Sequence, residues 1–105
     1  MNLNFISDPN QVPRPQEEVR IVNFDLEPYD DHKRTRLEIQ LTPFMPQVRP
    51  NIEITAYNQD EILVASANII ETTSYLNYLT LHLRDTNTSG VYIFKAILYF
   101  EKWID

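Results

Sequence analysis

The chain has 105 residues, of which 43% are hydrophobic and 23% charged, enough for one globular domain and too few for two. Fifteen acidic residues against nine Lys and Arg give a formal net charge of −6, which disfavours nucleic acid as a partner. The absence of cysteine excludes a disulfide framework and thiolate chemistry.

The cellular location is predicted from the sequence by looking for signal-peptide and membrane-spanning segments. The first ten residues contain neither a basic segment nor an apolar run of signal-peptide length. The apolar run over residues 97–100 is far too short to span a bilayer. We therefore expect a cytoplasmic protein that does not bind membranes.

Residues 1–18 predict an extended N-terminal arm that precedes a domain over residues 19–105. Three prolines between residues 9 and 15 disfavour regular structure in the arm. Leu3, Phe5 and Ile6 could still dock as a short edge strand.

In the domain, apolar residues recur with a period of two, which is typical of β-strands. Residues 19–26 predict a first strand with Val22, Phe24 and Leu26 on one face, and residues 27–33 a turn. The clearest strand follows, where Leu37, Ile39 and Leu41 alternate with polar residues. This alternation indicates one buried and one wet face.

The second half of the chain predicts four further strands, after a proline-rich stretch over residues 42–50. They span residues 51–57, 62–70, about 76–84 and 91–101. The inner set of the strand over residues 62–70 is predicted to be Leu63, Ala65, Ala67 and Ile69. Gly90, the only glycine, indicates a backbone conformation that other residues resist. Six strands with room for a seventh predict an all-β sandwich or barrel.

The strand over residues 79–85 and the following Ser89-Gly90-Val91-Tyr92 resemble the passage between strands E and F of immunoglobulin-like domains. This resemblance implies an immunoglobulin-like β-sandwich of the fibronectin type, with six to seven antiparallel strands. It also implies that the hydroxyl of Tyr92 turns back to the backbone. The chain departs from the pattern at Asp85, five residues before Gly90, and in lacking the inter-sheet cysteines. It is also similar to small bacterial proteins, a likeness that implies no activity.

No residue pattern predicts catalysis, a metal or a cofactor. Asp85, Asn87 and Ser89 imitate the start of a calcium-binding loop, but Ala96 occupies the position of the bidentate carboxylate. The two histidines lie far apart in the sequence, and no cysteine could join them around zinc. We therefore expect a protein that is not an enzyme and carries no cofactor.

The last strand is apolar on both faces, which predicts an interaction surface. If it neighbours the strand over residues 51–57, its outward side chains combine with that strand's to expose Tyr57, Ile93, Ile97 and Tyr99. A contiguous apolar patch with aromatic anchors marks a contact site. The sequence thus favours a non-catalytic protein-interaction or accessory module, with self-association as a homodimer through this face.

Two alternatives remain open at this point. The N-terminal arm, or Trp103 and Ile104, could fold over the patch instead of a partner. The six tyrosines could instead form a stacking platform for a small ligand or carbohydrate, with Tyr57, Tyr75, Tyr78 and Tyr99 as candidates. The last strand is also predicted to be an unprotected edge, which invites pairing with another chain.

Overall fold

The computed structural model describes residues 12–85 and 90–100 and confirms the all-β fold class. One short 3-10 helix, η3 (Gln16–Glu18), precedes the strands. The strands are β1 (Ile21–Pro28), β2 (Arg34–Leu41), β3 (Asn51–Tyr57), β4 (Leu63–Ile69), β5 (Leu76–His82) and β6 (Ile93–Tyr99). Among the described residues, no helix is long and apolar enough to cross a membrane.

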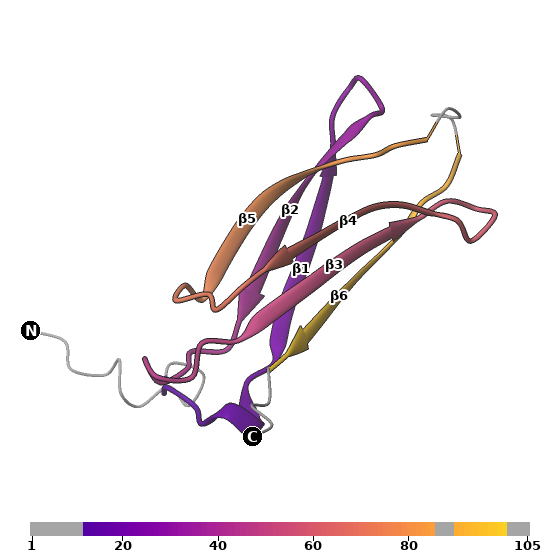
Figure 1. Ribbon diagram of the computed structural model, residues 1–105. Helices are drawn as coiled ribbons and strands as arrows, with labels where there is room; N and C mark the ends of the chain where they lie inside the picture. The colour runs from indigo at the N-terminus through magenta and orange to yellow at the C-terminus, as the bar shows by residue number, and fades with distance from the viewer. Residues whose placement is uncertain (1–11, 86–89, 101–105) are drawn as a thin grey trace, which may run out of the picture.

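The six strands form two antiparallel sheets of three strands each, ordered β1-β2-β5 and β4-β3-β6, which face each other (Figure 1). The last strand pairs with β3 along its whole length, from Asn51 opposite Tyr99 to Tyr57 opposite Ile93. The predicted adjacency of these two strands is therefore confirmed. In the described residues, β1, β4, β5 and β6 are all edge strands.

The two central strands supply most of the core. Alternate residues of β2 and β3 are at most 1% exposed: Leu37, Ile39, Leu41, Ile52, Ile54 and Ala56. Because side chains of a strand point to opposite faces in turn, three apolar residues at alternate positions cover one face of each sheet. Phe44 from the proline-rich loop closes one end of this core at 2% exposure.

A β-bulge changes the face assignment predicted for the first strand. Ile21 lies opposite Leu41, but Asn23 lies opposite Gln40, so Val22 is an extra residue in β1. The extra residue shifts the alternation by one position, which leaves Ile21 and Phe24 packed against the core and Val22 55% exposed. The prediction that Val22 and Phe24 share a face is wrong for this reason.

A second bulge changes the inner set predicted for β4. Ala56 lies opposite Ala65, whereas Tyr57 lies opposite Leu63, so Val64 is the extra residue. Val64 is 4% exposed and belongs to the core, while Leu63 is 52% exposed. The placement of Leu63 inside was therefore wrong, although Ala65, Ala67 and Ile69 pack against the core as predicted.

The prediction for Gly90 is also wrong. Its φ is not positive, and a Cβ added there would be in ordinary contact with the side chain of Gln59. In the described part of the chain, positive φ occurs instead at turn residues that carry side chains: His32, Arg49, Glu61 and Glu71. The turns of this domain therefore use left-handed backbone without glycine.

The described part of the arm is joined to the proline-rich loop. The amide of Arg14 donates to the carbonyl of Pro43 at 3.0 Å, and the amide of Met45 donates back to Arg14 at 3.3 Å. These bonds form an isolated parallel bridge between Arg14 and Phe44. Residues 12–18 thus lie at the end of the sandwich where β2 ends, and Val19 enters the core at 1% exposure.

Candidate functional site

A cluster of exposed apolar side chains lies at one end of the β4-β3-β6 sheet, beside the turn between β3 and β4. Tyr57 is paired across strands with Leu63 on one side and Ile93 on the other. Leu63 and Ile93 are 52% and 54% exposed, and Val91, two residues before Ile93, is 70% exposed. We refer to Tyr57, Leu63, Val91 and Ile93 as the β3–β4 patch.

The structure divides the surface that the sequence predicted. Ile97, 51% exposed, lies on the same face as Ile93 but about 13 Å further along β6. Lys95 lies between them, and its Nζ lies 5.1 Å from the centre of the Tyr57 ring. At the far end, the hydroxyl of Tyr99 donates to Oδ1 of Asn68 at 3.3 Å. Tyr57 and Ile93 therefore belong to the β3–β4 patch, whereas Ile97 and Tyr99 lie beyond a polar row.

Sequence reasoning missed the contribution of Leu63, which was predicted to face the core. The three residues Ile62, Leu63 and Val64 are consecutive and apolar, so alternation alone cannot decide which of them faces the core. The bulge at Val64 decides it by turning Leu63 outward. In the sequence, the run of three apolar residues directly after a turn indicates that alternation alone cannot identify the residue that faces the core.

The outer face of this sheet is electrically neutral. Glu53 and Lys95 are the only charged residues in β3, β4 and β6, while the whole chain has a formal net charge of −6. Lys95 lies opposite Thr55 and Ile97 opposite Glu53, so the two charges occupy neighbouring rows of the face. Electrostatic repulsion at long range is therefore weakest on this side of the domain.

The outer face of the β1-β2-β5 sheet has a different character. Asp25 lies directly opposite Glu38, and Glu27 lies opposite Arg36. Two carboxylates facing each other across strands are destabilising unless water screens them. Arg36 also lies over the ring of Tyr78, 4.9 Å from its centre. We conclude that this face is solvated.

The four tyrosines considered as a stacking platform lie on three separate surfaces. Tyr57 and Tyr99 are on the outer face of one sheet, at opposite ends of β3, and Tyr78 is on the outer face of the other. Tyr75 lies at the end of the sandwich, where its hydroxyl donates to the carbonyl of Phe44 at 3.2 Å. The structure does not bring these rings together into one platform.

The histidines face different clefts. His32 lines a cleft of about 330 Å³ between β1, β2 and the start of β6, and His82 lines one of about 470 Å³ between β4 and β5. Within residues 12–85 and 90–100, no three His, Asp or Glu side chains are grouped as metal ligands. Of the residues resembling a calcium loop, Asn87 and Ser89 lie outside the described residues.

Among the described residues, two titratable groups, Asp31 and Tyr92, have shifted pKa values. The backbone amide of Lys33 lowers the pKa of Asp31, helped by the guanidinium of Arg34 at 2.8 Å, in the turn between β1 and β2. Burial raises the pKa of Tyr92, and a hydrogen bond from its hydroxyl to the carboxylate of Asp85, 3.1 Å long, raises it further. The second bond joins the chain leaving β5 to the chain entering β6.

Comparison with known proteins adds no assignment to these surfaces. No protein-family model, no curated protein and no solved structure matches this chain. The function must therefore be argued from the surfaces themselves.

Proposed function

We propose that this domain is a non-catalytic protein-interaction module that associates with a second copy of itself through the β3–β4 patch. The observation that carries the proposal is the clustering of Leu63 and Ile93 on either side of Tyr57, each aliphatic side chain more than half exposed. Soluble domains rarely leave apolar side chains together in water unless the surface binds something. Tyrosine is also among the residues enriched at the energetic centres of interfaces.

The patch is suited to be the centre of an interface. Full burial of a Leu, Ile or Val side chain contributes about 1.5–3 kcal/mol, so covering the exposed half of Leu63, Val91 and Ile93 gives roughly 1 kcal/mol apiece. Association costs at least about 4 kcal/mol in lost freedom. The rest of the outer face, including Ile97, would therefore have to join the contact, within the roughly 800 Å² that a stable interface buries on each side.

The charges of the face support a second copy as the partner. In a twofold contact the same surface of both copies takes part, so where residue i of one copy meets residue j of the other, j of the first copy also meets i of the second. Glu53 and Lys95 are opposite in sign and lie in adjacent rows, so two symmetrical ion pairs can form across such a contact. The neutral face also avoids the repulsion that two chains of charge −6 would meet elsewhere.

We further propose that the sandwich is immunoglobulin-like. The first, second and fifth strands share one sheet, and the third and sixth are neighbours in the other, as strands A, B, E and C, F are in that fold. Tyr92 also reaches back across the loop after β5, to the side chain of Asp85. These features support the resemblance found between residues 79 and 92.

Sedimentation of the chain over a concentration series tests the proposed association. We expect a dimer, and we expect Ile93→Lys to weaken it by about thirtyfold or more, because the substitution buries a charge at the centre of the contact. Val22→Lys is the matched control, since Val22 is equally exposed at 55% but lies on the other sheet. A monomer at every concentration, or equal losses in both variants, would contradict the proposal.

A further inference from the structure

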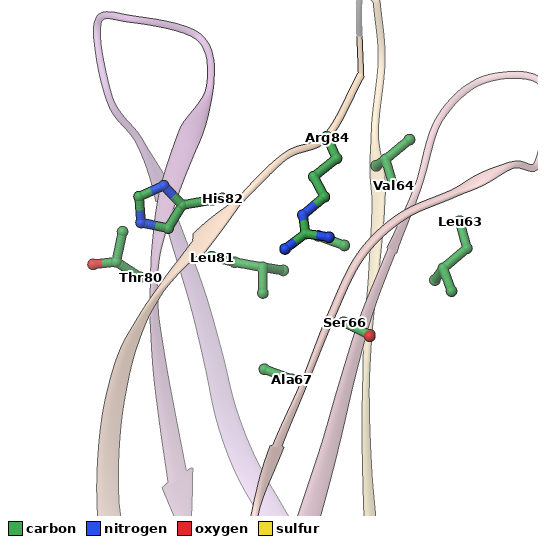
Figure 2. Close-up of a pocket in the computed structure, with 9 residues that line it drawn as sticks. Leu63, Val64, Ser66, Ala67, Thr80, Leu81, His82 and Arg84 are labelled. Atoms are coloured by element: carbon green, nitrogen blue, oxygen red, sulfur yellow. The ribbon is translucent and has the colours of Figure 1, made fainter.

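A cleft of about 470 Å³ opens between β4 and β5, along one side of the sandwich (Figure 2). Its floor is formed by Val64 and Leu81, each 4% exposed. Figure 2 shows the side chain of Arg84 in the gap between the two strands. The β4 side of the cleft consists of two alanines and a serine, residues 65–67, so additional side chains have room to enter.

The two strands that border this cleft are unprotected edges. Neither β4 nor β5 contains Asp, Glu, Lys, Arg or Pro. The other two edges carry features that discourage pairing: β1 has the bulge at Val22 and Pro28, and β6 has Lys95 at its centre. Since proteins normally protect free edges in these ways, the β4 and β5 edges are the ones open to a strand from another chain.

The backbone of β5 is oriented to accept such a strand. The amide of Leu83 donates to the carbonyl of Lys33, beside β2, at 2.7 Å. The amide of the next residue, Arg84, donates in the other direction, to the carbonyl of Val64 at 2.8 Å. Because backbone groups alternate in direction along a strand, the even-numbered residues of β5 direct their N–H and C=O groups away from β2 and toward the cleft.

The free part of this edge is limited at both ends. At one end the hydroxyl of Ser74 donates to the carbonyl of Leu76 at 2.7 Å and accepts from its amide at 3.2 Å. At the other end, the bond between residues 84 and 64 joins β5 to β4. Among the described residues, no strand pairs with the outward groups between these ends, those of Tyr78, Thr80 and His82. An extended segment of about five or six residues fills this length.

The charge of the cleft favours an acidic partner. Of the described residues that line it, none is Asp or Glu, whereas Arg84 carries a positive charge. Within residues 12–85 and 90–100, the guanidinium of Arg84 has no carboxylate partner. The chain as a whole has a formal net charge of −6, so this end of β5 is a local site where a carboxylate is attracted and not repelled.

We propose that an extended segment of another protein, with an acidic residue at its N-terminal end and alternating apolar residues after it, pairs with β5 as an added antiparallel strand. In this direction the N-terminal end of the segment lies beside the C-terminal end of β5, where its carboxylate meets Arg84. Its side chains opposite Leu79 and Leu81 point inward and cover the floor of the cleft. This partner is additional to the second copy proposed above, which covers the outer face of the other sheet.

Titration of a synthetic peptide into the isotope-labelled chain, followed by NMR, tests this proposal. The probe is Glu-Thr-Val-Thr-Val-Thr, acetylated and amidated so that its only charge is the Glu side chain. We expect saturable binding that shifts the amide signals of Tyr78, Thr80 and His82. The matched peptide with Lys in place of Glu should bind about tenfold more weakly or less still. Absence of saturable binding, or shifts confined to another surface, would overturn the proposal.

Two substitutions identify the contacts. Arg84→Glu should reverse the preference between the two peptides, whereas Arg49→Glu, which changes the same exposed charge before β3, should leave it unchanged. Thr80→Pro removes an amide that points into the cleft and breaks no bond to β2, so it should weaken binding by about tenfold or more. Thr80→Val keeps that amide and should bind as the unmodified chain does. Equal binding by Thr80→Pro and Thr80→Val would contradict the added strand.

The result is independent of the proposed association between copies. Leu63 lines the cleft and also belongs to the β3–β4 patch, but Ile93 does not line the cleft. Ile93→Lys should therefore bind the Glu peptide as tightly as the unmodified chain. Loss of peptide binding in this variant would overturn the added strand, because the peptide would then occupy the patch. The mass of the chain in solution bears on the proposed function alone, so the two proposals can fail separately.

Discussion

The two sheets have similar inner faces and dissimilar outer faces. Leu37 in β2 and Ile54 in β3 occupy equivalent central positions and are both fully buried. Outside, the strands of the β1-β2-β5 sheet carry five charged residues, and those of the β4-β3-β6 sheet carry two of opposite sign. The inner pattern is what holds this fold together, and the outer pattern is free to differ because it contributes little to stability.

The exposed apolar residues of the β3–β4 patch lie on the face with fewer charges, which adds to the difference between the two outer faces. On the charged face, a carboxylate pair such as Asp25 and Glu38 must stay hydrated, so covering it would be costly. On the neutral face, covering Leu63 and Ile93 removes apolar surface from water and sacrifices no hydration of a charged group. A partner is therefore expected on one of the two outer faces only.

The largest expected effect tests the equivalence of the inner faces. Leu37→Ala and Ile54→Ala should each lower the free energy of unfolding by about 2–5 kcal/mol, because each leaves a cavity in the same core. Urea denaturation measures both, and Val22→Ala should cost less than about 0.5 kcal/mol as an exposed control. A loss below about 1 kcal/mol at either buried site would show that the two sheets do not share one core.

A smaller effect tests the difference between the outer faces. Lys95→Glu places two acidic residues on the neutral face, so self-association should weaken by about tenfold at low salt and less at high salt. The double variant Glu53→Lys/Lys95→Glu restores the opposite pair and should recover the association. Arg36→Glu changes the net charge by the same amount on the other sheet and should have little effect. Sedimentation distinguishes these outcomes, and equal weakening by both single variants would remove the distinction between the faces.

An effect of similar size concerns the contact that links the two sheets at one end. Tyr92→Phe removes the hydrogen bond to Asp85 and should lower the free energy of unfolding by about 1–2 kcal/mol near pH 7. Because burial and Asp85 raise the pKa of Tyr92 in the folded state, its contribution is complete below the ordinary tyrosine pKa of 10.0. It is lost as the pH rises through the folded-state pKa. Unfolding midpoints between pH 7 and 11 should therefore fall more steeply for the unmodified chain than for the variant, and parallel curves would contradict this assignment.

The sequence predicted the positions of the strands better than it predicted which side chains of each strand face the core. The strict alternation of Leu37, Ile39 and Leu41 was sufficient to place that strand and its buried side. Where Val22 and Val64 bulge, an extra residue is inserted without any change in composition, so the alternation on one side of the bulge is shifted by one position relative to the other. Of the four site residues predicted, Tyr57 and Ile93 fall in the β3–β4 patch, and Leu63 was missed because of the second bulge.

The sequence by itself determined the all-β class, the approximate extent of six strands and the two-sided hydrophobicity of the last one, because these depend on local periodicity and turn residues. Only the tertiary structure decided the division into sheets, the registers and the surface on which exposed residues meet. These depend on pairings between residues far apart in the chain, such as Tyr57 with Ile93, and local patterns do not specify which strand lies beside which. The neutral face of one sheet and the charged face of the other are consequences of those pairings.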